Sequence, residues 1–299
     1  MPVLMVFVDG LGLGEPGPSN PLWCAHTPVL DRLCGQRPVW PLSTQDNARA
    51  LDACLGVPGL PQSATGQTTL LTGINAARLE GGHVSAYPTA RLKELLTRAG
   101  LPARLAARGY RVAFINAFRS VSLERIRQGT YAATATTCAM LGAQVPLRGV
   151  TQLASGDAVY HDLTGETLRR HGEEVELVSP QQAGRRAGSI ALAHDFSLFE
   201  YFLTDVAGHR RDKAMAVSCL EALDSFLAGA METLDGRVTL VLTSDHGNVE
   251  DLSTGSHTVN PVPLVWTGPS QDTSPGPLSS IMHVGPLILW WLGVRPDEH

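Results

Sequence analysis

TSDHGNVEDLSTGSHTVNPVPLVW, residues 243–266, says more about this chain than any other stretch. The apolar, β-branched run 238–243 leads into it, so Asp245 and His246 are expected where a buried strand ends and a loop begins. His257 follows eleven residues after His246. A carboxylate and two imidazoles are ligand types that bind divalent metals. The segment therefore favours a metal site over the simpler alternative, a polar surface loop.

Two other apolar runs lead to carboxylates. Near the N-terminus, VLMVFVDGLGLG is a hydrophobic run that ends at Asp9 and continues into glycines, which is typical of a central parallel strand. In FSLFEYFLTDVAGH the apolar run ends at Asp205, and His209 follows four residues later, a spacing that places both side chains on one face of a helix or turn. The carboxyl ends of the strands in an open α/β sheet line one crevice. Asp9, Asp205 and Asp245 are therefore expected to converge.

A serine precedes a stretch rich in small and hydroxyl-bearing residues, LPQSATGQTTLLTG at 60–73. If this stretch turns helical, the hydroxyl of Ser63 would lie near the first backbone N–H groups, where the helix dipole favours a phosphate. A plain helix cap is the alternative interpretation of the same pattern.

These motifs, in this order, resemble the cofactor-independent phosphoglycerate mutases and, more widely, the alkaline phosphatase superfamily of metalloenzymes. The similarity includes the opening VDGLG, NPLWCAHTPVLDRL, the serine segment, DVAGHRRD followed by EALD, SDHGN with SHTVNPVP, and the closing PLILWWLGV. Together with the apolar runs, it predicts an α/β fold: a three-layer sandwich with a mostly parallel sheet, like that of alkaline phosphatase, and a small inserted cap.

The resemblance implies two divalent ions bound side by side, Mn²⁺ or Mg²⁺ as in the mutases or Zn²⁺ as in many phosphatases. The implied ligands of these ions fall into two groups. One ion is assigned Asp205, His209 and His257, and the other is assigned Asp9, Ser63, Asp245 and His246. Ser63 is implied as the nucleophile because the run from Ser63 to Gly73 keeps the glycine spacing of the mutases. Thr65 and Thr68 remain possible supporting hydroxyls.

A serine hydroxyl is a poor nucleophile at neutral pH, and a coordinated cation lowers its pKa. A second ion nearby can neutralise charge on a transferring phosphoryl group. A phosphoserine at Ser63 would then pass its phosphoryl group back to the substrate, as in a mutase, or to water, as in a phosphatase or phosphodiesterase.

The chain departs from the mutases in its insert. The mutases carry a large second domain that supplies arginines, whereas here residues 1–117 and 179–299 follow the pattern of the core and only 118–178 are left for a cap. Candidates for gripping substrate are His83, Arg119, Arg125, Arg127 and Arg148. A small cap favours hydrolysis of a small phosphorylated metabolite, with intramolecular phosphotransfer as the alternative.

Other classes of function fit less well. A sulfatase would need a C/S-x-P-x-R setting, which is absent around Ser63. A non-catalytic metal-binding relative would be expected to have lost some of the seven ligand residues, all of which are present. A closed structural metal site would not need an adjacent hydroxyl.

Composition bounds the remaining choices. The 299 residues are 43% hydrophobic and 17% charged with a net charge of −5, which predicts one large globular core and no nucleic-acid partner. No uninterrupted apolar stretch approaches the ~20 residues of a membrane span, and the N-terminus lacks a basic leader, so a cytoplasmic protein without a membrane partner is expected. The five scattered cysteines are expected to be reduced and mostly buried. The oligomeric state is left open.

Overall fold

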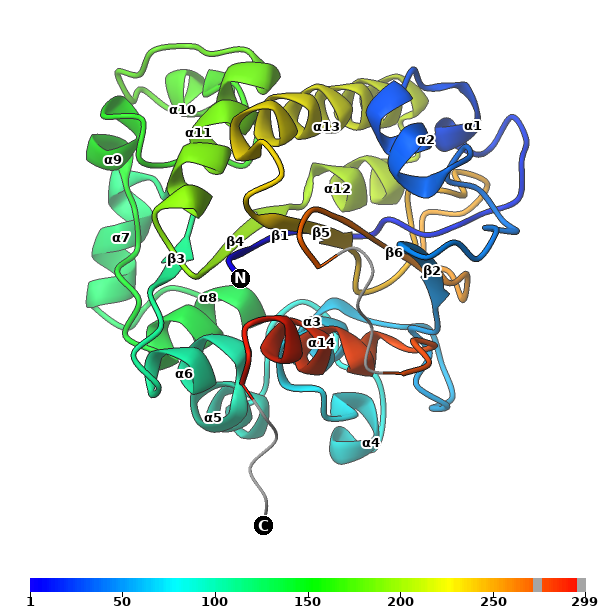
Figure 1. The fold of residues 1–299 in the computed structure, drawn as a ribbon, viewed down its shortest axis with the longest axis horizontal. Helices are drawn as coiled ribbons and strands as arrows, with labels where there is room; N and C mark the ends of the chain where they lie inside the picture. The colour runs from blue at the N-terminus through cyan, green and yellow to red at the C-terminus, as the bar shows by residue number, and fades with distance from the viewer. Residues whose placement is uncertain (271–275, 295–299) are drawn as a thin grey trace.

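The computed structural model describes residues 1–270 and 276–294, and its centre is a six-stranded sheet in the order β2-β6-β5-β1-β4-β3 (Figure 1). The strands are β1 Val3–Val8, β2 Ala48–Leu51, β3 Val112–Phe114, β4 Phe196–Tyr201, β5 Thr239–Thr243 and β6 Val262–Thr267. Strands β3, β4, β1 and β5 are mutually parallel, and β6 is antiparallel to both β5 and β2. The predicted α/β sandwich with a mostly parallel sheet is confirmed.

Helices cover both faces of this sheet (Figure 1). In chain order they are α1 Pro21–Cys24, α2 Pro28–Cys34, α3 Ser63–Thr72, α4 Ala76–Glu80, α5 Ala90–Ala99, α6 Leu101–Ala106, α7 Ser120–Arg127, α8 Ala135–Gly142, α9 Val150–Ala154, α10 Glu166–Arg170, α11 Pro180–Leu192, α12 Leu203–Arg210, α13 Lys213–Leu234, the short 3₁₀ helix Ile281–His283 and α14 Val284–Trp291. Helices α11 and α13 pack on one face, and α3, α5, α6, α8 and α14 pack on the other.

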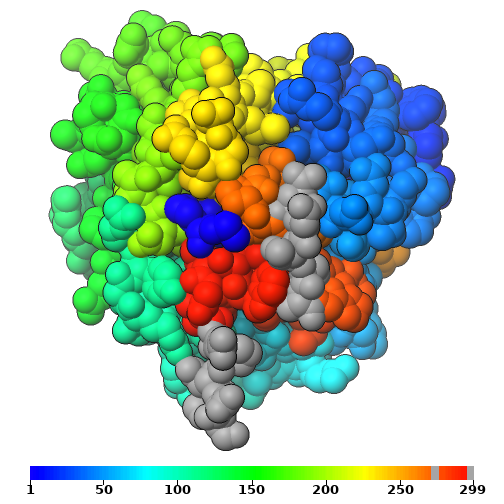
Figure 2. Space-filling model, in the orientation of Figure 1, coloured from blue at the N-terminus to red at the C-terminus, as the bar shows by residue number. Residues whose placement is uncertain are grey.

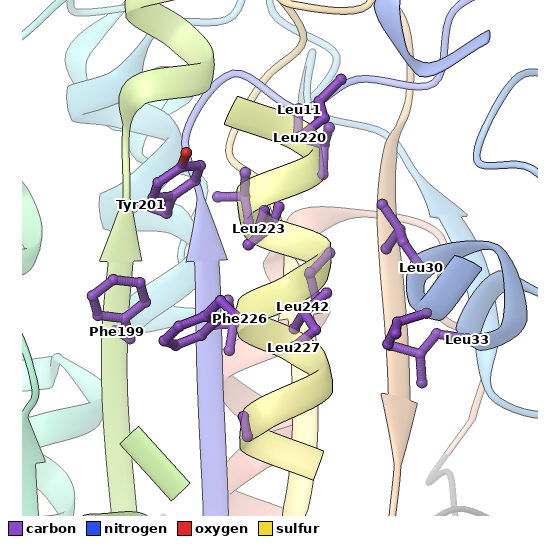
Figure 3. Packing of buried hydrophobic residues seen from close by; sticks show 14 of the residues in the cluster. Leu11, Leu30, Leu33, Phe199, Tyr201, Leu220, Leu223, Phe226, Leu227 and Leu242 are labelled. Atoms are coloured by element: carbon purple, nitrogen blue, oxygen red, sulfur yellow. The ribbon is translucent and has the colours of Figure 1, made fainter. Parts of the chain in front are cut away.

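Strand β1 explains why the core has two halves. All six of its residues are buried, as expected for a central strand covered on both faces. Because side chains alternate along a strand, Leu4, Val6 and Val8 enter the core under α13, whereas the residues between them enter the core against α3 and α14. Figure 3 shows the first of these cores, in which residues of α13 pack against β4 and β5.

Strand register brings the predicted ligands to one edge. Val8 pairs with Tyr201, and Phe7 pairs with Thr243, so β1, β4 and β5 all end at the same level. The apolar run that leads to Asp205 is extended only in part, and the helix or turn expected for Asp205 and His209 is a helix. The pairing between β4 and β1 ends at Tyr201, and α12 then carries both Asp205 and His209.

The segment predicted to be a cap has mixed packing. A small cluster formed by Leu153, Ala158, Tyr160 and Leu168 holds α9 and α10 together, and α7 lies with α9 beside β3 (Figure 1). Helix α8, in contrast, packs against α3 and α5 within the core. The division at 118 and 178 therefore stays a prediction.

Two further expectations concern buried and apolar residues. Of the five cysteines, which are all free thiols, Cys34 and Cys219 are buried, so the prediction that most of them are buried is wrong. Within the described ranges, α13 alone is long and apolar enough to cross a membrane, but half of that stretch is buried in the fold, as in a core helix. The N-terminal residues lie beside α14 (Figure 2), where the Met1 amino group is 3.4 Å from the Trp291 carbonyl.

Candidate metal centre

The ends of β1 and β5 and the start of α3 bring four ligand-type side chains together. The Nε2 atom of His246 lies 3.0 Å from Ser63 Oγ, 3.3 Å from Asp9 Oδ1 and 3.5 Å from Asp245 Oδ2. Asp9, Asp245 and His246 are buried. One nitrogen and three oxygens thus face a common point, an arrangement that suits a divalent cation.

A second group forms beside the first. Helix α12 carries Asp205 and His209, and their Oδ2 and Nε2 atoms are 3.3 Å apart. The loop after β5 returns His257, whose Nε2 lies 3.7 Å from Asp205 Oδ1 and 3.1 Å from His209 Nε2. The imidazoles of His246 and His257 stack with their centroids 3.8 Å apart, so the two groups are in contact.

Backbone carbonyls decide how the imidazoles are oriented. His209 Nδ1 lies 2.8 Å from the Gly255 oxygen, and His257 Nδ1 lies 2.7 Å from the Pro61 oxygen. A carbonyl oxygen only accepts, so each Nδ1 carries a proton and donates it. In the neutral rings both Nε2 atoms then present lone pairs to each other, which is unfavourable unless a cation lies between them.

Two buried carboxylates also require a cation nearby. Asp9 Oδ1 and Asp245 Oδ2 are buried oxygens without a hydrogen-bond partner. Burial, followed by repulsion from Asp245, raises the pKa of Asp9, and burial lowers the pKa of His246. Unpaired buried charges are costly unless they coordinate a metal. The donor set therefore fits two adjacent divalent ions, with Ser63 within reach of one of them.

Two side-chain amides and one hydroxyl hold Asp205 and Asp9 in place. Asn248 Nδ2 donates to Asp205 Oδ1 at 2.7 Å, and Gln67 Nε2 lies 3.4 Å from Asp9 Oδ2. Thr204 Oγ1 donates to the Asp9 carbonyl at 2.6 Å. Such partners fix the orientation of metal ligands.

Glu250 joins the loops that carry the ligands. One of its carboxylate oxygens accepts from the backbone amides of Gly12 at 3.0 Å and Asn248 at 2.7 Å. The other accepts from Thr258 Oγ1 and from Asn260 Nδ2, the latter at 3.1 Å. This buried carboxylate thereby links the segment after β1 to both the His246 and the His257 parts of the loop.

The start of α3 distinguishes Ser63 from the two threonines near it. Ser63 is the first residue of the helix, and its side chain lines a cleft. The hydroxyl of Thr65 donates to the Gln62 carbonyl at 3.1 Å, and that of Thr68 donates to the Ala64 carbonyl at 2.6 Å. Both threonine hydroxyls are therefore committed to the backbone, whereas Ser63 Oγ faces the metal ligands.

Glycines allow the elements to approach at this point. A Cβ on Gly66 would lie 2.9 Å from Asp245 Cβ, and one on Gly10 would lie 2.8 Å from Asp205 Oδ1. Gly10 also has a φ of +70°, which favours glycine. The glycines that follow Asp9 and Ser63 in the sequence are thus required by close packing.

The cleft above Ser63 has a volume of about 490 Å³. Of the residues predicted to grip substrate, Arg119 lines a smaller hollow that shares walls with this cleft. The others are placed elsewhere: Arg125 and Arg127 are exposed on α7, Arg148 donates to the Phe114 carbonyl at 2.8 Å, and His83 Nε2 lies 3.3 Å from the Val57 oxygen. Glu200 also lines both hollows, although nothing in the sequence marks it as a site residue.

Glu200 makes the stability of the metal-free protein dependent on pH. Burial raises the pKa of Glu200 from 4.5 to about 7. The folded state therefore keeps a proton that the unfolded state releases, and stability falls as pH rises from about 4.5 to about 7. We expect Glu200→Gln to relieve roughly 3 kcal/mol of this loss above pH 7. Thr136 Oγ1, which donates to Glu200 Oε2, can donate equally to the amide oxygen.

Thermal unfolding of metal-free protein at pH 5 and pH 8 measures this effect. The Tm of Glu200→Gln should exceed that of wild type by more at pH 8 than at pH 5. Glu232→Gln, an exposed change on α13, serves as the control and should show the same difference at both pH values. An equal Tm difference for Glu200→Gln at both pH values would contradict the assignment.

Sequence comparisons find similarity to metalloenzymes. The profile of the Metalloenzyme superfamily matches residues 1–289. A 2,3-bisphosphoglycerate-independent phosphoglycerate mutase of Desulforudis audaxviator is 32% identical over 136 residues, 40% of this chain and 26% of that protein. A phosphopentomutase of Sinorhizobium medicae is 34% identical over 93 residues, 31% of this chain and 23% of that protein. The matched part thus spans about a quarter of these relatives.

Solved structures share the fold over nearly the whole chain. A protein of Pyrococcus horikoshii has a TM-score of 0.59 at 13% identity and covers 100% of this chain and 98% of its own. Alkaline phosphatase of the Antarctic bacterium TAB5 has a TM-score of 0.53 at 12% identity, with 99% of each chain covered. Phosphoglycerate mutase of Leishmania mexicana, crystallised at low cobalt concentration, has a TM-score of 0.54 at 13% identity, with 99% and 96% covered.

Proposed function

This chain belongs to the Metalloenzyme superfamily, and we propose that it catalyses phosphoryl transfer on a small phosphoester at two divalent ions, with Ser63 as the nucleophile. The observation that carries the proposal is the position of Ser63 Oγ, 3.0 Å from His246 Nε2 beside two buried carboxylates. Mn²⁺, Mg²⁺ or Zn²⁺ would be held by Asp205, His209 and His257 and by Asp9, Ser63, Asp245 and His246.

The chain's own residues would position the reaction. When bound, the two ions would lower the pKa of the serine hydroxyl and neutralise charge on the phosphoryl oxygens. Ser63 Oγ, having lost its proton to water, would form a bond to phosphorus as the bond to the substrate's ester oxygen breaks, and that oxygen would take a proton from water as the alcohol leaves. The start of α3 favours negative charge beside Ser63. Water, or a hydroxyl of the substrate, would then take the phosphoryl group from the phosphoserine.

The lining of the cleft favours hydrolysis. A phosphoglycerate carries a carboxylate besides its phosphate, and arginine or lysine is the usual partner of such a group. Around the two hollows, as far as the structure describes them, Arg119 is the only arginine or lysine. The relatives named as mutases support the alternative, an intramolecular phosphotransferase.

Phosphorus NMR of the manganese-loaded protein with a panel of phosphomonoesters, including 3-phosphoglycerate, tests the proposal. We expect the inorganic phosphate resonance to grow, and the ester consumed fastest would indicate the substrate class. Conversion of an ester into its positional isomer without free phosphate would instead establish a mutase. No change with any ester, together with retained manganese, would favour a non-catalytic metal-binding relative.

A further inference from the structure

A second hollow of about 170 Å³ adjoins the cleft above Ser63. The two spaces share the side chains of Tyr131, Thr134, Glu200 and Phe202 as walls. A phosphoester whose phosphorus lies at Ser63 can therefore extend its organic part into the second hollow. Residues of the predicted cap form much of its lining.

Aromatic rings form the walls of this hollow. The imidazole of His161 packs against the rings of both Tyr160 and Phe202, with centroid distances of 4.2 and 4.5 Å. Phe118 and Tyr131, which also line the hollow, meet edge to face with their ring centroids 6.2 Å apart. A cavity of roughly 150 Å³ admits benzene, so this volume suits one aromatic ring. Flat apolar walls favour a planar guest over a branched one.

Two polar side chains in the lining of the hollow, those of Arg119 and His161, add a preference for a ligand that forms hydrogen bonds. Arg119 Nε and His161 Nδ1 are buried and have no hydrogen-bond partner. Arg119 is a donor only, so it requires an acceptor. Burial lowers the pKa of His161 to about 4, which leaves its imidazole neutral at neutral pH. Both residues line the hollow, and unpaired buried polar groups in such a lining are expected to be satisfied by a ligand or by water.

We propose that this hollow binds the leaving group of the phosphoester, and that this group is an aromatic ring with a hydrogen-bond acceptor on its rim. The acceptor would pair with Arg119, and the ring would pack against Phe202 and Tyr131. The role as a leaving-group site rests on the proposed phosphoryl transfer, but binding of the ring itself does not.

Calorimetry with 4-nitrophenol, an aromatic alcohol whose nitro oxygens are acceptors, tests binding without turnover. We expect saturable binding that is at least about tenfold tighter than that of cyclohexanol. Ser122→Trp places an indole in the hollow and should weaken the binding of 4-nitrophenol at least tenfold. Val121→Trp, on the exposed side of the same helix, is the matched control and should leave it unchanged. Equal binding of the two alcohols, or no effect of Ser122→Trp, would overturn the proposal.

Kinetics separate this proposal from the catalytic one. If the chain hydrolyses phosphoesters, Ser122→Trp should raise KM for 4-nitrophenyl phosphate about tenfold and leave KM for methyl phosphate unchanged, because methyl phosphate lacks the ring. Selective binding of 4-nitrophenol without turnover of any ester would contradict phosphoryl transfer and keep the ring site. Turnover with equal KM values in both tryptophan variants would overturn the ring site alone.

Discussion

Replacing Ser63 by alanine is expected to lower turnover of a phosphomonoester by at least roughly 10³-fold. The hydroxyl that would attack phosphorus is removed, and the neighbouring threonine hydroxyls are bonded to backbone carbonyls. Manganese at Asp205, His209 and His257 should remain bound, since Ser63 is not part of that group. Steady-state kinetics and metal analysis of the same preparation measure both effects.

Two further measurements make this result specific. Acid-quenched wild-type protein should carry covalent phosphate on the peptide containing Ser63, and the variant should carry none. Ser189→Ala removes an exposed hydroxyl on α11 and should leave turnover unchanged. Full activity of Ser63→Ala, or phosphate on another residue, would exclude Ser63 as the nucleophile.

The positions of four of the seven proposed ligands follow from simple features of the sequence. Asp9 comes directly after one fully buried strand and Asp245 two residues after another, and parallel strands that share a register must end together. The spacing of Asp205 and His209 needs only one helical turn to bring both to one side. The structure brings these residues together, although their role as ligands remains a prediction.

Residues on the substrate side could not be predicted in the same way. An arginine in a loop or helix has no periodic pattern to show whether it faces solvent, a carbonyl or a cleft. Arg125 is solvated and Arg148 bonds to the backbone, whereas Arg119 is turned inward at the start of α7. The role of Glu200 in the lining of the hollows could not be predicted, because this residue lies within an otherwise apolar strand.

Supporting contacts between residues far apart in the chain could not be predicted from the sequence either. Glu250 accepts a hydrogen bond from Gly12, a residue 238 positions away, and Gln67 reaches Asp9 from α3. Such pairs depend on how whole elements pack, and no local pattern of hydrophobic residues or turns specifies them. The same limit applies to α8, whose Ala- and Thr-rich sequence did not indicate that it packs in the core.

His257 connects the two ligand groups to the nucleophile. Its Nε2 faces Asp205 and His209, and its ring stacks on His246. Its Nδ1 donates to the carbonyl of Pro61, two residues before Ser63. A change at this position should therefore weaken one ion directly and disturb the start of α3 as well.

His257→Ala is accordingly expected to reduce bound manganese from about two ions per chain to about one, and turnover by at least roughly 10²-fold. Elemental analysis after gel filtration at a fixed free metal concentration measures the stoichiometry. His194→Ala is the matched control, because His194 also donates through Nδ1 to a backbone carbonyl, that of Ile190 at 2.7 Å, but lies outside both ligand groups. Unchanged manganese in His257→Ala would remove His257 from the ligands. Loss of both ions would show that the stacked pair His246–His257 makes the two sites interdependent.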